Sequence, residues 1–152
     1  MPHEFSGSAV IDRPIGTVFS FLADGANDPK FSPRVQDIKK TTDGPIGVGT
    51  VFESKVKDAG MTTSRRFELT VFEEPTKIRW AERSKNMLTV PDGGYDLEQL
   101  SDTQTKVTIH NTLEGHGFGK LIVGLAVRAA IKDAPAFAQR IKAAVEAGTA
   151  GG

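Results

Sequence analysis

The stretch VFESKVKDAGMTTSRRFELTVFEEPTKIRW, from Val51 to Trp80, alternates apolar and polar residues around two turn signals. Ala59-Gly60 is the first signal and Glu74-Pro75 is the second, and both are typical of the turns between β-strands. A hairpin centred on Ala59-Gly60 places Phe52 opposite Phe67. This stretch therefore predicts three consecutive antiparallel strands.

The second hairpin tests the register of the first, because a slip of one residue would turn every apolar side chain to the other face. Centring it on Glu74-Pro75 places Leu69 opposite Trp80 and Val71 opposite Ile78. Both pairings put apolar residues on the same face, so we predict a sheet with an apolar inner face and a wet outer face. The residues expected on the outer face are all charged: Glu53, Lys55, Lys57, Arg66, Glu68, Lys77, Arg79 and Arg83.

Further strands are expected before and after this stretch. The alternation from Phe5 to Ile11 predicts a first strand, and turn signals divide the region from Arg34 to Leu113 into about six strands. Pro91 cannot donate a ladder hydrogen bond and predicts a bulge or a sheet edge. A three-residue loop in the last hairpin would pair Tyr95 with Ile109 and Leu97 with Val107.

Two short helical segments are expected after the first strand. Asp12 is suited to cap a helix that contains Pro14 in its first turn, and Asp24-Gly25 is suited to end it. A further short helical turn is expected between Pro29 and Pro33.

The segment from Phe118 to Ala147 is rich in Ala, Ile, Val and Lys and predicts one long helix. Pro135 lies inside it and is expected to kink the helix or to divide it. The apolar face of the sheet must be covered, and this helix is the large element left to cover it. Its apolar positions include Leu121, Ile122, Leu125, Ile131, Phe137, Ile141 and Val145.

Six segments carry a resemblance to a known family: VIDRPIGTVFSFLAD (10–24), FSPRV (31–35), GVGTVFESKV (47–56), FEEPTKIRW (72–80), YDLEQL (95–100) and TKVTI (105–109). In this order they resemble the START-like (SRPBCC) helix-grip superfamily, and more closely its polyketide cyclase/dehydrase branch. The resemblance covers residues 3–147 and implies an α+β helix-grip fold. In that fold a seven-stranded antiparallel sheet wraps around a long C-terminal helix, with two short helices after strand 1.

The same resemblance implies a hydrophobic small molecule held between the sheet and the helix. Some members of the superfamily carry lipids or hormones, and others are aromatase/cyclases. We expect residues 1–147 to form a single START-like ligand-binding domain and residues 148–152 to be a disordered tail.

Composition narrows the function further. The chain of 152 residues has no cysteine, which excludes disulfides, thiolate catalysis and cysteine-based metal sites. Lysine plus arginine equals aspartate plus glutamate at 19 each, so no basic excess points to nucleic acid. Without a signal sequence or a long apolar run, we expect a cytoplasmic protein with no membrane insertion. No cofactor is expected. His110, Glu114 and His116 share strand parity, but no metal site is expected there, because Gly115 should end the strand and His110 should face outward.

The inner face carries charge, which is costly to bury unpaired. The predicted register turns Arg65 inward, with Glu82 one diagonal step away. Arg65 would bind a carbonyl, enolate or carboxylate group of a ligand, or it would form a structural ion pair with Glu82 near the sheet rim. The side chains expected at a ligand pocket are Phe52, Ser54, Arg65, Phe67, Trp80, Glu82, Tyr95, Asn111, Leu125 and Phe137.

Three function classes stay open. The leading one is a binding protein for a small hydrophobic ligand, with Arg65 and Tyr95 orienting one polar end. The second is an enzyme similar to a polyketide cyclase/dehydratase, in which Arg65 would stabilise an enolate and Tyr95 or Glu82 would move a proton. The resemblance supports a pocket arginine in that role. The third is a regulatory interaction module without a ligand, and the oligomeric state is left open.

Overall fold

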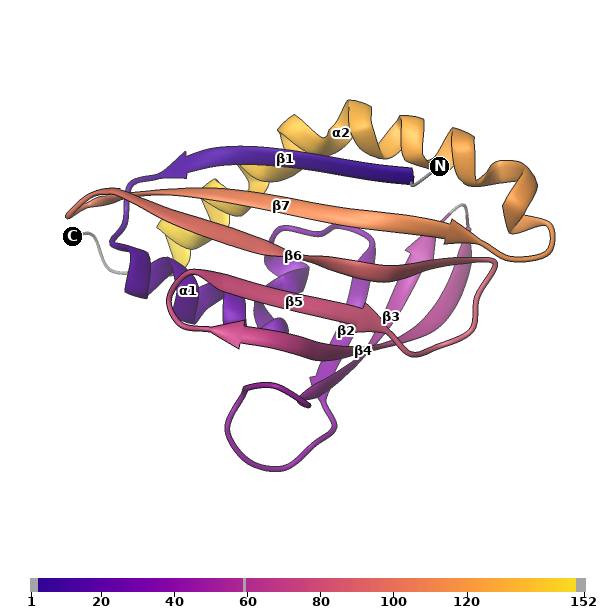
Figure 1. Cartoon of the computed structure of the whole chain (residues 1–152), viewed down its shortest axis with the longest axis horizontal. Coiled ribbons are helices and arrows are strands. Elements are labelled where there is room, and N and C mark those ends of the chain that lie inside the picture. Colours follow the sequence, from indigo (N-terminus) through magenta and orange to yellow (C-terminus); the bar gives the residue numbers. More distant parts are fainter. Residues whose placement is uncertain (1–2, 59, 150–152) are drawn as a thin grey trace.

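The computed structural model describes residues 3–58 and 60–149. The predicted fold class is confirmed, because seven strands form one antiparallel sheet with a long helix packed on it (Figure 1). The elements are β1 (His3–Ile11), α1 (Ile15–Ala23), η1 (Gly25–Lys30), β2 (Val35–Lys40), β3 (Val51–Asp58), β4 (Met61–Glu73), β5 (Lys77–Glu82), β6 (Leu88–Ser101), β7 (Gln104–Gly115) and α2 (Gly119–Gly148). The strand order in the sheet is β1-β7-β6-β5-β4-β3-β2.

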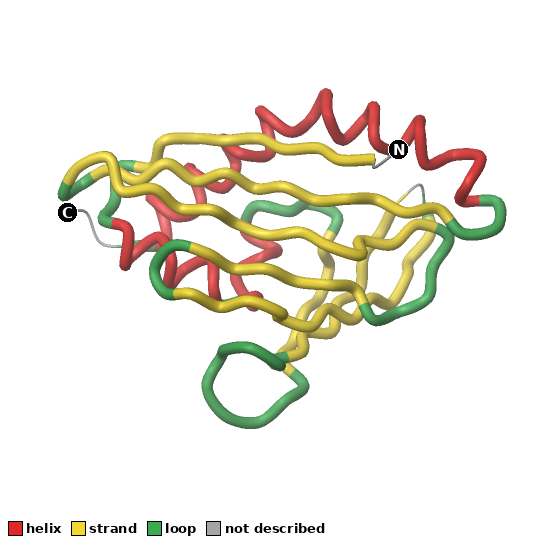
Figure 2. The backbone as a smooth tube through the Cα atoms, viewed as in Figure 1, coloured by secondary structure: helices red, strands yellow, loops and turns green. Residues whose placement is uncertain are grey.

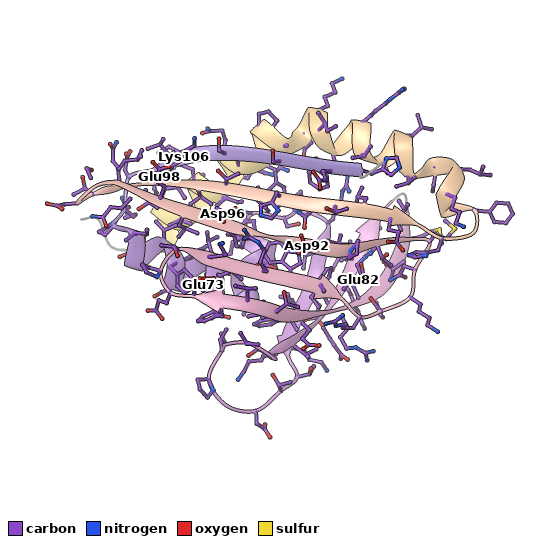
Figure 3. The ribbon with its side chains drawn as sticks, in the orientation of Figure 1. Glu73, Glu82, Asp92, Asp96, Glu98 and Lys106 are labelled. Carbon is purple, nitrogen blue, oxygen red and sulfur yellow. The ribbon has the colours of Figure 1, made fainter. Side chains whose placement is uncertain are left out.

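The strands make one continuous curved sheet, and the loop of residues 41–50 extends away from it (Figure 2). Helix α2 packs on β1 and β7. It approaches β1 so closely that a Cβ atom on Gly7 would lie 2.5 Å from the carbonyl oxygen of Ala134. Ile11, Ile141 and Val145 are fully buried at this contact between sheet and helix. Charged side chains such as Asp96, Glu98 and Lys106 project from β6 and β7 on the outer face (Figure 3).

The predicted first hairpin is confirmed, since Phe52 pairs with Phe67 and Ser54 pairs with Arg65. The second hairpin follows the predicted register only as far as Leu69 opposite Trp80. A register shift beyond Leu69 then places Phe72, and not Val71, opposite Ile78. The shift lets Phe72 pack edge-on against Phe19, with 5.1 Å between the ring centres. The last residues of β4, next to the turn into β5, therefore also contribute to the core.

The predicted pairs Tyr95 with Ile109 and Leu97 with Val107 are confirmed in the last hairpin. Its connection differs, because the strands continue to Ser101 and Gln104 and a register shift after Gln99 takes up the extra residue. The expected bulge around Pro91 is present as a second register shift, between Thr89 and Asp92.

The short helices begin elsewhere than predicted. Pro14, and not Asp12, occupies the N-cap position of α1, and the carboxylate of Asp12 instead accepts hydrogen bonds from Gln104 and Lys142. The second short helix, η1, begins before the first of the two prolines, contains Pro29 and ends at Lys30. It begins directly after α1 because the side chain of Asp24 accepts a hydrogen bond from the backbone N–H of Ala26 at 3.0 Å.

Helix α2 continues through Pro135 as one helix of 30 residues, so of the two expected effects of Pro135, a kink or a division, the division is wrong. Its expected apolar face is also partly wrong, because Leu121 and Leu125 are 77% and 67% exposed. A helix turns its side chains by about 100° per residue, so the positions next to a buried stripe face solvent. The buried stripe consists of Gly119, Val123, Val127, Ala134, Ala138, Ile141 and Val145, and Ile122 and Ile131 lie outside it.

The end of α2 is held by side chains from the start of the chain. Arg13 donates one hydrogen bond to the hydroxyl of Thr149 at 3.0 Å and another to the carbonyl of Glu146 at 2.7 Å. Gly148 and Thr149, which were expected in the tail, are therefore part of this packed end, and residues 150–152 lie outside the described residues. Across the described ranges, no helix combines the length and the apolar character needed to cross a bilayer.

Candidate functional site

The inner face of the sheet, η1 and α2 enclose a cavity of about 340 Å³. Its walls are aromatic and aliphatic over most of their area, with a few polar side chains among them. This composition is typical of sites for small organic molecules. Of the side chains predicted for a pocket, the cavity is lined by Phe52, Ser54, Arg65, Phe67, Trp80, Tyr95, Asn111 and Phe137.

Two predicted pocket residues do not line this cavity. Leu125 points into solvent, and Ala126 and Ala130 face the cavity from α2 instead. The reason is helical geometry, since adjacent residues of a helix differ by about 100° in direction. Glu82 lies behind Arg65, and its side chain is fully buried.

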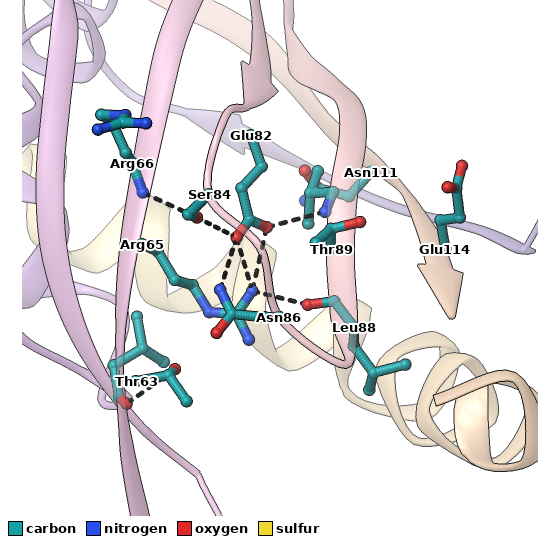
Figure 4. A network of polar contacts seen from close by, with 12 residues as sticks. Thr63, Arg65, Arg66, Glu82, Ser84, Asn86, Leu88, Thr89, Asn111 and Glu114 are labelled. Carbon is teal, nitrogen blue, oxygen red and sulfur yellow. Dashed lines mark hydrogen bonds and ion pairs between the residues drawn. The ribbon is translucent and has the colours of Figure 1, made fainter. Parts of the chain in front are cut away.

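Glu82 is held by a network of donors around the guanidinium of Arg65 (Figure 4). Its Oε1 accepts from Nη1 of Arg65 and from the backbone N–H of Val90, both at 3.0 Å. Its Oε2 accepts from the hydroxyl of Ser84 at 2.5 Å and from Nδ2 of Asn86 at 3.1 Å. These hydrogen bonds fix the carboxylate in place, so Glu82 positions Arg65.

Arg65 connects this network to the cavity. Its Nη1 is occupied by Glu82 and by the carbonyl of Leu88 at 3.0 Å. Among the described residues, Nε and Nη2 of Arg65 have no hydrogen-bond partner, and the side chain is 18% exposed. The structural ion pair and the ligand-facing arginine that the sequence left as alternatives are thus compatible in one side chain, because each uses different N–H groups.

Trp80 and Asn111 line the cavity from neighbouring parts of the sheet. Nε1 of Trp80 donates to Oδ1 of Asn111 at 3.1 Å, and the ring of Trp80 meets that of Tyr95 edge-on at 5.0 Å between centres. Gly93 makes room for this pair, since a Cβ atom there would lie 2.0 Å from Oδ1 of Asn111. The indole is therefore fixed in orientation, with its polar edge satisfied inside the protein.

Asp28 is a cavity residue that the sequence analysis missed. It comes from η1, and the loss of water around its carboxyl group, with a smaller contribution from the charge of Asp24, raises its pKa to about 7. Burial, and to a lesser degree the charge of Asp28, raises the pKa of the Tyr95 hydroxyl well above its ordinary value. Asp28 stands among turn residues in a helix of six residues, which is too short for a periodic pattern to indicate its direction.

The histidines considered as metal ligands have other contacts. Nε2 of His110 lies 3.3 Å from Oδ2 of Asp96, and Nε2 of His116 lies 2.8 Å from the hydroxyl of Thr89. Within residues 3–58 and 60–149, no group of three or more histidines and carboxylates is placed to hold a metal ion.

Comparison with known proteins is consistent with this architecture. The model of the family described as "polyketide cyclase / dehydrase and lipid transport" matches residues 2–146. The structure is similar to the Zhui aromatase/cyclase from Streptomyces sp. R1128, with a TM-score of 0.79 and 12% identity over 96% of this chain and 94% of that one. It is also similar to a START superfamily protein from Mycobacterium smegmatis, with a TM-score of 0.76 and 15% identity over 96% and 99% of the two chains.

A protein from Thermus thermophilus shares the same architecture, with a TM-score of 0.77 and 16% identity over 97% of this chain and 99% of that one. No curated protein matches the sequence. At these identities, the similarity to solved structures establishes the fold alone.

Proposed function

This chain belongs to the polyketide cyclase/dehydrase and lipid transport family, and from that premise we propose that it binds a small hydrophobic molecule in the cavity between its sheet and α2. The binding unit is one domain over residues 1–147. The observation that carries this proposal is the cavity itself, about 340 Å³ of space with predominantly apolar walls and the guanidinium of Arg65 among its lining groups.

Two physical contributions would hold the ligand. Apolar surface transferred from water to these walls contributes roughly 25 cal/mol for each Å² buried. The free N–H groups of Arg65 orient a carbonyl or carboxylate end, because a guanidinium whose position is fixed by Glu82 loses little freedom on binding.

The first test is a native mass spectrum of the freshly purified protein, followed by extraction and identification of any released molecule. A stoichiometric hydrophobic adduct supports the proposal and identifies the chemical class of the ligand. A protein that elutes without an adduct and also fails to bind added decanoate contradicts it.

Decanoate binding has an internal reporter, because Trp80 is the single tryptophan of the chain and lines the cavity. We expect the fluorescence of Trp80 to change when decanoate binds. Arg65→Lys should weaken the affinity for decanoate by about tenfold, because lysine lacks the planar pair of donors. The matched control is Arg83→Lys, since Arg83 makes an exposed ion pair with Glu68. Equal affinities in the two variants would exclude Arg65 as the anchor.

An enzyme resembling a polyketide cyclase/dehydratase is the second candidate, and it requires a group that moves a proton. Glu82 is surrounded by donors, and the raised pKa of Tyr95 keeps its hydroxyl protonated. Asp28 is the cavity carboxyl whose pKa of about 7 suits proton transfer. If the protein is a dehydratase, incubation with the extracted ligand should yield a product that has lost one water molecule. Mass spectrometry of the incubated mixture detects this loss.

A further inference from the structure

Asp28 and Tyr95 are two polar side chains of the cavity whose side-chain atoms have no partner within the described part of the protein. Asp28 lines the cavity from η1, and Tyr95 lines it from β6 in the middle of the sheet. Over the described residues, neither the carboxyl group of Asp28 nor the hydroxyl of Tyr95 makes a hydrogen bond. Their polar atoms are not sealed in the core either, so they are accessible from the cavity space.

The position of Asp28 is fixed by its backbone. Its carbonyl accepts hydrogen bonds from the N–H groups of Phe31 at 3.2 Å and Ser32 at 2.9 Å. Nδ2 of the neighbouring Asn27 donates to the carbonyl of Phe21 at 2.9 Å, which ties η1 to α1. A Cβ atom on Gly25 would lie 2.9 Å from the ring of Phe52, so η1 is also packed against the sheet. The carboxyl group of Asp28 is therefore held at the cavity wall.

The charged groups around Asp28 come from several elements. Asp24 precedes it at the start of η1 and contributes a like charge. The ammonium of Lys30 lies 5.5 Å from the ring centre of Phe21, and Arg34 lines the same cavity. From α2, Arg140 donates to the carbonyl of Phe31 and to Asp133. Lys30 and Arg140 thus have other partners, and among the contacts of the described residues none engages the carboxyl group of Asp28, so its hydrogen-bonding capacity is left for a ligand.

A ligand that fills the cavity removes these polar atoms from solvent, and a polar group left there without a partner costs free energy. A ligand that supplies the partner avoids that cost. A ligand hydroxyl is suited to both residues, because it can donate to the carboxyl of Asp28 and accept from the hydroxyl of Tyr95. Tyr95 serves as the donor because its raised pKa keeps its hydroxyl protonated.

We propose that Asp28 and Tyr95 form a second polar anchor that binds a hydroxyl group of the ligand, at a distance from the end that Arg65 binds. The cavity would then select an apolar molecule with a carboxylate or carbonyl at one end and a hydroxyl further along. This inference rests on the proposed binding function and specifies its ligand class. It gives a role to two polar side chains of the cavity that take no part in the hydrogen bonds around Arg65 and Glu82.

The test compares decanoate with 10-hydroxydecanoate, a flexible pair that differs by one terminal hydroxyl. Titration calorimetry should give the wild type at least equal affinity for the hydroxylated probe. In Asp28→Leu and in Tyr95→Phe, the affinity for 10-hydroxydecanoate should fall to about one tenth of the affinity for decanoate. This is the size expected for the loss of one hydrogen bond to a buried group. Asp28→Asn should retain most of the preference, because an amide also accepts and donates hydrogen bonds.

Asp37→Leu is the matched control, because Asp37 is exposed on β2 and should leave both affinities unchanged. If wild type and Asp28→Leu discriminate equally between the probes, the second anchor is wrong while the proposed binding function stands. If neither probe binds the wild type, both proposals are wrong. Circular dichroism of each variant verifies that a lost affinity does not reflect a lost fold.

Discussion

Nη1 of Arg65 lies 3.0 Å from Oε1 of Glu82, and this contact joins the middle of β4 to the end of β5 beside the cavity. The two partners differ in environment, because the side chain of Glu82 is fully buried while that of Arg65 is 18% exposed. Removing the cation would leave a buried carboxylate without its counter-charge. Removing the carboxylate would leave an arginine that still reaches water and the carbonyl of Leu88.

This asymmetry predicts a large energetic coupling between the two residues. Arg65→Met should lower the free energy of unfolding by about 3–5 kcal/mol, which is typical when one partner of a buried pair is removed. Glu82→Gln should cost less, and the double variant should be more stable than the sum of the single effects implies. Urea unfolding of the four proteins measures the coupling, and additive effects would show that the ion pair contributes nothing specific.

Asp28→Asn should make stability less dependent on pH. Burial raises the pKa of Asp28 from 3.8 to about 7, so between these values the folded protein retains a proton that the unfolded chain has released. The free energy of unfolding of the wild type should therefore fall as the pH rises from about 4 to about 7, by on the order of a few kcal/mol. The variant should lack this contribution, and its advantage should be greatest above pH 7.

Urea unfolding of wild type and Asp28→Asn at several pH values measures this difference. Comparing the two proteins removes the contributions of Asp12 and Glu146, whose lowered pKa values act in the opposite direction in both. Asp37→Asn provides a control for the loss of one exposed carboxylate. Parallel profiles for wild type and Asp28→Asn would mean that Asp28 titrates as it does in the unfolded chain.

The sheet was predictable because its information is local. Turn positions and alternation specify which residues face each other, and pairs such as Phe52 with Phe67 and Tyr95 with Ile109 follow from them. The register shift that brings Phe72 inward was not predictable in this way. It depends on the contact of Phe72 with Phe19, a residue of α1 that is distant in the sequence.

The candidate site was predictable where it lies on strands. Arg65 and Trp80 face the cavity because strand parity places them there. The predicted resemblance to the polyketide cyclase/dehydrase branch is confirmed by the family that matches residues 2–146. Leu125 was misplaced because Leu121 to Ile131 is apolar on almost every side, which leaves the buried direction of α2 undefined. Asp28 has no regular pattern around it at all.

Gly7→Ala should destabilise the contact between β1 and α2. A Cβ atom at this position would lie 2.5 Å from a backbone oxygen of Ala134, so one of the two elements must move. We expect a loss of about 1–3 kcal/mol, as for other overpacked positions. Gly124→Ala in α2 is the control, since a Cβ atom there would meet no packed neighbour within 4 Å beyond the backbone of its own helix, and it should stabilise α2 by up to about 1 kcal/mol. Thermal unfolding of both variants measures the two opposite shifts.

Ala130→Phe should close the cavity from the helix side. Ala130 lines the cavity and Ala129 is exposed, although the two residues are adjacent in α2. A phenyl ring at position 130 would occupy much of the space left for a ligand, so decanoate affinity measured by Trp80 fluorescence should fall by at least about tenfold. Ala129→Phe adds the same ring on the solvent side and should leave the affinity unchanged.

Ala126→Leu provides a second, smaller obstruction from the same wall of the cavity, should the phenyl ring disturb folding. Its effect on decanoate affinity should have the same direction and a smaller size, because less space is filled. If decanoate binds equally well to the wild type and to both cavity variants, the ligand lies elsewhere on the protein. If Ala129→Phe alone weakens binding, the exposed face of α2 is where decanoate binds, and the cavity is not the site.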